Sequence, residues 1–150
     1  MTNTEFEAML ADASKRIEGD IIWTEDEDHS PALEFRAVVQ SDAGYPLVVR
    51  GWLNRLTGKL SFTLLHRSEG RVLALDLGSD HHNPSCEMVG EKHKHRWSET
   101  LKDRDAYVPA DVTSGVDDPV ETWRQFCAEA NIVHSGALLP APPQQEELPL

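Results

Sequence analysis

Four of the chain's seven histidines lie within residues 75–99, at positions 81, 82, 93 and 95. His93 and His95 form a His-x-His pair. Alternate residues of a β-strand point to the same side, so the two imidazoles would lie side by side if this segment is a strand. His82 precedes the pair by a loop that could fold back beside it. The segment predicts a histidine site, and three interpretations of it stay open.

The first interpretation is a metal site. Imidazole is a common ligand of zinc, iron and copper, and three or four donors are enough to hold such an ion. His82, His93 and His95 would supply three donors to a divalent transition metal such as zinc, with Asn83 orienting His82. A fourth donor could be Glu99, Asp80 or Cys86.

The second interpretation is catalysis without a metal. His82, His93 and His95 would then be catalytic residues that exchange protons with a phosphodiester substrate, while a nearby cation stabilises the developing charge. The candidate cations are Lys94, Arg96 and Arg104. In a regular strand, however, Lys94 and Arg96 point away from the histidine pair. The third interpretation is structural, with the histidines only bonding to turns, so the sequence leaves open whether the protein is an enzyme.

Three runs carry a resemblance to a known family: LDLGSDHHNPSCEMVGEKHKHRW, DRDAYVP and WRQFCAEANI, within about residues 72–133. They resemble a poorly characterised bacterial domain family that is frequent in prophages and mobile elements. The pattern comprises Leu-Asp-x-Gly, His-x-Asn-Pro, a Gly-x-His-x-His-like element, Ala-Tyr-x-Pro and a closing helix that ends in Cys-x-x-x-Asn-Ile. The resemblance implies a shared site, to which Tyr107 is a supporting residue, and a phage or mobile-element context. It implies no reaction, and Cys86 stands where the family pattern has glycine.

The elements that must position these residues follow from periodicity. Residues 4–18 and 117–131 predict helices, the first capped by Thr4 and Glu7, the second by Asp118 with Pro119 at its first position. Between them, apolar runs separated by short turns predict antiparallel strands. These runs are Ile21–Thr24, Leu33–Gln40, Leu47–Leu56, Lys59–Arg67 and Arg71–Leu77. The polar segment Glu91–Glu99, which contains the His-x-His pair, is also expected to be a strand. We therefore expect an α+β fold in which a helix from each end packs on an antiparallel sheet of about five to seven strands.

Length and charge limit the function classes. The 150 residues suit one domain, expected over residues 1–135, followed by a flexible Pro-, Gln- and Glu-rich tail over 136–150. The net charge of −12 disfavours direct binding to nucleic acid. No apolar run is long enough to span a membrane. With no secretion signal, Cys86 and Cys127 are expected to be reduced thiols in the cytoplasm.

The acidic charge also supports an alternative function. A small acidic protein of phage type could mimic DNA and bind a host protein complex as an inhibitor, without catalysis. One negative face would then be formed by Asp20, Glu25, Asp26, Glu27, Asp28, Asp111, Asp117 and Asp118.

Overall fold

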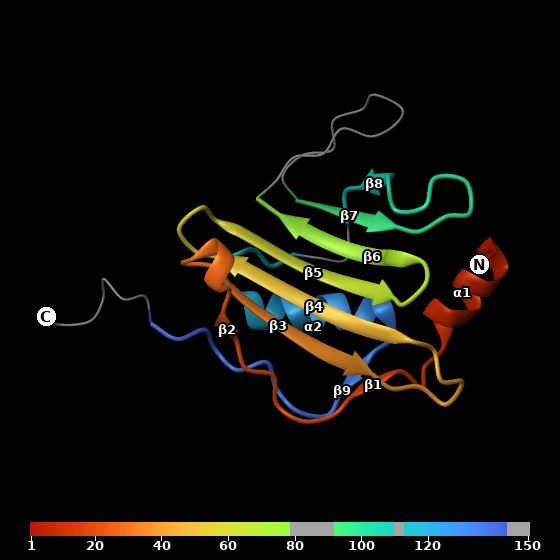
Figure 1. Cartoon of the computed structure of the whole chain (residues 1–150), viewed down its shortest axis with the longest axis horizontal. Helices are drawn as coiled ribbons and strands as arrows, with labels where there is room; N and C mark the ends of the chain where they lie inside the picture. Colours follow the sequence, from red (N-terminus) through yellow and green to blue (C-terminus); the bar gives the residue numbers. More distant parts are fainter. Residues whose placement is uncertain (79–91, 110–112, 144–150) are drawn as a thin grey trace, which may run out of the picture.

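The computed structural model describes residues 1–78, 92–109 and 113–143. Its largest element is a seven-stranded antiparallel sheet whose strands are neighbours in chain order, from β2 to β8 (Figure 1). The strands are β2 (Thr24–Glu25), β3 (Leu33–Val39), β4 (Leu47–Asn54), β5 (Lys59–His66), β6 (Gly70–Leu77), β7 (Lys92–Arg96) and β8 (Ala106–Tyr107). Short turns join β4 to β5 and β5 to β6, and connections of this length favour antiparallel neighbours. The predicted α+β fold is confirmed.

The two faces of the sheet differ in chemistry because side chains alternate along each strand. One face is apolar and packs on helix α2 (Pro119–Ala130), which lies behind the sheet in Figure 1. Ring centroids of Phe35 and Trp123 are 5.5 Å apart, and those of Phe62 and Phe126 are 5.9 Å apart. The Phe35 ring packs against the Cα of Gly51, because a Cβ at position 51 would lie only 2.0 Å from the ring. The opposite face, called the open face below, carries mostly polar side chains and is not covered by α2.

Helix α2 matches its sequence pattern closely. Asp118 accepts a hydrogen bond from the Glu121 backbone N–H, Pro119 occupies the first turn, and Asn131 ends the helix in the left-handed conformation. Cys127 faces the core, where burial raises the pKa of its thiol to about 12. Cys127 is therefore a packing residue rather than a reactive one.

Helix α1 (Asn3–Ala11) is shorter than predicted and begins earlier. The capping box is formed by Thr2 and Glu5, not by Thr4 and Glu7. The helix ends at Ala11 because Lys15 folds back under its last turn. The Lys15 ammonium donates to the carbonyls of Met9, Leu10 and Asp12 at 2.7, 2.8 and 2.6 Å.

Two short segments, one toward each end of the chain, pair beside the large sheet. Strand β1 (Arg16–Ile17) pairs in parallel with β9 (Val133–His134), and the 3-10 helix η1 (Glu27–His29) precedes β3. Leu138 is buried and bridges to Ile21, so part of the segment predicted as a tail lies along the N-terminal region. No described helix is long and apolar enough to cross a membrane.

One ion pair joins α2 to the edge of the sheet. The ammonium of Lys94, which is fully buried on β7, contacts the carboxylate of Glu129 on α2. The hydroxyl of Tyr107 on β8 donates to the same carboxylate at 2.8 Å. Both contacts lie on the helix-covered face, because Lys94 and Tyr107 are direct cross-strand partners. They hold β7 and β8 against the helix.

Replacing Lys15 with methionine should destabilise the fold by about 2 kcal/mol, because three carbonyls at the end of α1 lose a charged donor. Urea unfolding would measure the change. The exposed Lys59→Met variant is the control and should change the free energy of unfolding by less than about 0.5 kcal/mol. Equal losses in the two variants would contradict the capping role.

Replacing Glu129 with glutamine should cost about 3 kcal/mol, because it removes the carboxylate that neutralises the buried Lys94. The Lys94→Met/Glu129→Met double variant should be more stable than Glu129→Gln, since it removes both charges. Glu121→Gln, which breaks an exposed pair on the same helix, is the control and should be nearly neutral. Thermal unfolding measures the order of stability among the variants. A double variant that is less stable than Glu129→Gln would refute the prediction.

Candidate functional site

The site is formed by the pairing of β6 with β7. Asp76 lies directly opposite His93, and Ala74 lies opposite His95. His93 and His95 are two residues apart, so both imidazoles lie on the same face as the Asp76 carboxylate. That face is the open face, opposite to the one that binds α2. We call these three residues the Asp–His cluster.

The three side chains converge on a single carboxylate oxygen. Oδ2 of Asp76 lies 3.4 Å from Nε2 of His93 and 3.3 Å from Nε2 of His95. The two imidazole centroids are 5.1 Å apart, and the potential ligand atoms all lie within 4.8 Å of one another. Both histidines are 2% exposed, whereas the Asp76 side chain is 20% exposed. The cluster is therefore buried on the histidine side and reachable through the carboxylate.

Neighbouring groups fix the orientation of the cluster. The second oxygen of Asp76 accepts a hydrogen bond from the Ser61 hydroxyl at 2.7 Å. Nδ1 of His95 lies 2.8 Å from the backbone carbonyl of Asp103, and a carbonyl can only accept, so Nδ1 carries a proton. The Asp103 carboxylate in turn accepts from Arg71 at 2.7 Å, and Arg71 stands 3.8 Å from Asp76.

The electrostatic balance favours an ionised Asp76. Burial raises the pKa of this carboxyl, but the hydrogen bond and positive charge that His95 supplies when protonated, the hydrogen bond from Ser61 and the charge of protonated His93 outweigh burial and lower the pKa. Asp76, Asp103 and Arg71 together carry one net negative charge when the histidines are neutral. The cluster is consequently a place where positive charge is stabilised.

The tautomer of His95 determines what the cluster can do. With the proton on Nδ1, a neutral His95 directs the lone pair of Nε2 at the Asp76 carboxylate, and two acceptors face each other at 3.3 Å. Either a second proton on the imidazole or a cation bound between the groups removes this conflict. Two imidazole nitrogens and one carboxylate oxygen are a donor set that zinc and other divalent transition metals bind.

The structure brings together two of the three histidines predicted for the site. His93 and His95 converge as expected, whereas His82 and Asn83 lie outside the described residues. Glu99 is exposed, beyond the end of β7, and its backbone N–H donates to Asn3. The Tyr107 hydroxyl binds Glu129 near α2, on the other face of the sheet.

The predicted cations also lie elsewhere. Lys94 faces α2, as the strand alternation indicated. Arg96 binds the carboxylate of Glu7 at 2.6 Å and lies over the Phe6 ring, and Nε of Arg104 donates to the Leu101 carbonyl. The basic side chain near the cluster is instead Arg71.

Sequence reasoning missed Asp76 as a member of the site. Its signal was a lone acidic residue within the apolar strand VLALDL, where an unpaired charge is costly. Asp76 belongs to the predicted strand just before the histidine segment, but only the register of β6 against β7 places it opposite His93.

Comparison with known proteins places the chain in a family. No curated protein and no solved structure matches the chain. A family model does match, over residues 1–132, which include both helices, the seven-stranded sheet and all three members of the Asp–His cluster. The resemblance to a family without an assigned reaction is thereby confirmed, and the chain belongs to the family of unknown function DUF6978.

Proposed function

We propose that this protein binds a divalent transition metal, with zinc as the best fit, through Asp76, His93 and His95. The observation that carries the proposal is the convergence of two Nε2 atoms and one carboxylate oxygen within 4.8 Å of one another. The Asp103 carbonyl fixes the His95 tautomer and leaves Nε2 as the ligand atom. Carbonyls and carboxylates commonly hold the far nitrogen of metal-binding histidines in this way.

The charges around the cluster support a cation. Arg71 stands near Asp76 but makes its shorter contact, at 2.7 Å, with Asp103. Asp103 thus largely neutralises the charge of Arg71, so the negative charge of Asp76 can attract a metal ion. Ser61 holds the other Asp76 oxygen and orients the carboxylate.

A three-ligand set also bears on catalysis. Catalytic zinc sites have three protein ligands and keep a position for water or substrate, whereas structural zinc sites have four. The proposal therefore includes hydrolysis of a phosphate ester as the activity to be tested. His82 remains a proposed further ligand or catalytic residue, because it lies outside the described residues.

The alternative of a DNA-mimicking inhibitor has less support. Asp26, one of the residues assigned to its negative face, is 5% exposed, and its carboxylate accepts from the Trp52 indole and contacts His29. It cannot imitate a phosphate at the surface. A cytoplasmic location, a phage context and a host protein partner remain predictions that accompany the proposal.

The purified chain, free of any tag, should bind about one zinc ion, and zinc should raise its melting temperature because the ion binds only the folded state. Asp76→Asn, which keeps the shape of the side chain, and His93→Gln/His95→Gln should each weaken zinc binding at least tenfold. Titration calorimetry and elemental analysis measure the affinity and the stoichiometry. His29→Ala removes a histidine outside the cluster and is the matched control.

Circular dichroism of each variant separates loss of the site from loss of the fold. If the wild type binds no zinc, manganese or iron, or if Asp76→Asn and His29→Ala bind zinc equally well, the metal proposal is wrong. The cluster would then be an imidazolium–carboxylate pair. The ring nitrogen shifts of His95 in nuclear magnetic resonance spectra would report the second proton.

A further inference from the structure

Two arginines face each other on the open face. Arg36 on β3 is the direct cross-strand partner of Arg50 on β4, and both side chains are exposed. Like charges directly opposite each other destabilise a sheet. The Glu34 carboxylate contacts Arg50 at 3.5 Å. An anion held between the two guanidinium groups would remove the repulsion.

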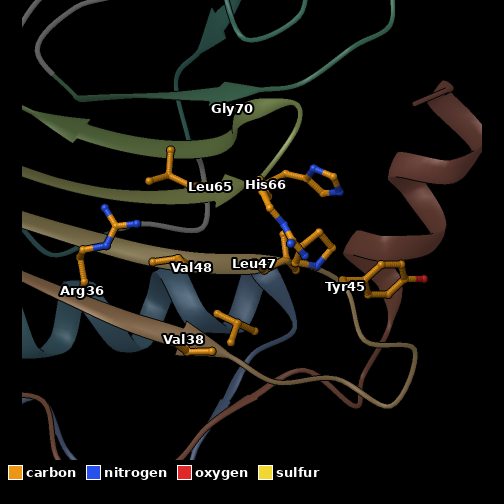
Figure 2. Close-up of a pocket in the computed structure, with 11 residues that line it drawn as sticks. Arg36, Val38, Tyr45, Leu47, Val48, Leu65, His66 and Gly70 are labelled. Atoms are coloured by element: carbon orange, nitrogen blue, oxygen red, sulfur yellow. The ribbon is translucent and has the colours of Figure 1, made fainter.

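An apolar groove adjoins this pair. Val38, Val48 and Leu65 form its floor, Arg36 stands at one end, and Tyr45 and His66 stand at the other (Figure 2). Its volume of about 620 Å³ suits a ligand of metabolite size. Val38 is 66% exposed, so the floor is accessible.

The charge of the groove is opposite to that of the chain. Its lining contains Arg36, Arg67 and His66 and no acidic residue, although the whole chain carries 26 acidic residues against 14 lysines and arginines. Basic side chains beside an apolar floor fit a molecule with an anionic group and a flat apolar body. Guanidinium groups match the oxygens of a phosphate especially well, because they donate in pairs.

A second hollow continues from the arginine pair toward the Asp–His cluster. It measures about 320 Å³ and is lined by His29, Arg50, Trp52, Ser61 and Thr63. Ser61 donates to Asp76, so this hollow reaches the cluster. Arg50 therefore stands between the apolar groove and the cluster.

From these contacts we propose that the open face binds a nucleotide. Its phosphate lies between Arg36 and Arg50, and its base lies on Val38, Val48 and Leu65. Nucleotide binding at this site does not require the metal. When both sites are filled, the phosphate end of the ligand lies on the side of the groove nearer to the Asp–His cluster.

A second copy of the chain fits this face poorly. A two-fold contact centred on the Arg36–Arg50 pair would bring this pair of one copy against the same basic surface of the other. Such a contact would add like-charge repulsion instead of relieving it. A nucleotide supplies both the anion and the apolar surface that the face requires.

Titration calorimetry of the full chain with adenosine and uridine monophosphates tests the proposal. At least one nucleotide should bind saturably, and its nucleoside and inorganic phosphate should each bind at least tenfold more weakly. Arg36→Gln and Arg50→Gln should each weaken nucleotide binding at least tenfold. Arg124→Gln makes the same change of charge on α2, behind the sheet, and should leave the affinity within about twofold.

Three results would overturn the proposal. The first is no saturable binding of either nucleotide at millimolar concentration. The second is equal weakening by Arg36→Gln and Arg124→Gln, which would indicate only general electrostatic attraction. The third is a wild-type dimer in sedimentation that the nucleotide does not dissociate. Nucleotide binding should survive in His93→Gln/His95→Gln, so failure of the metal site and failure of the nucleotide site are distinguishable.

Discussion

The register of β6 against β7 is the constraint on which the site depends. It places Asp76 opposite His93 and, through the two-residue repeat of the strand, gives His95 the same face. A slip of one residue would turn both imidazoles toward α2 and bring Lys94 to the open face. The geometry of the cluster is therefore a property of strand pairing, and the loops contribute the carbonyl of Asp103 that orients His95.

Helix α2 fixes this register from the other side of the sheet. Lys94 lies between the two histidines in sequence and is fully buried against Glu129. In the slipped register its ammonium would leave this carboxylate, and Glu129 would lose its cation in a half-buried position. The polar contact on the covered face thus disfavours the register that would dismantle the cluster on the open face.

Periodicity and turn chemistry predicted the sheet, the cap of α2 and the placement of His93 and His95 on the same face of one strand. Each of these features depends on residues close in sequence. The end of α1 could not be predicted in this way. Lys15 ends the helix by folding back onto the carbonyls of the last helical turn. Helix propensity, which reflects single residues and their sequence neighbours, does not predict such a contact. Asp76 was missed for a related reason: a strand pattern shows which residues alternate but not which residue of the next strand each one faces. The Arg36–Arg50 pair was missed because it too depends on register.

The chain-order topology of the sheet has a consequence for the folding route. Every strand from β2 to β8 pairs with the strand next in sequence, so each step of sheet formation closes a loop much shorter than the chain, the longest being residues 78–91 between β6 and β7. The β1–β9 pairing instead joins residues 16–17 to residues 133–134 and closes a loop over most of the chain. Because contacts between residues close in sequence form fastest, the meander that carries Asp76, His93 and His95 is expected to assemble before the termini dock. The cluster would then already be formed while the ends of the chain are still unpaired.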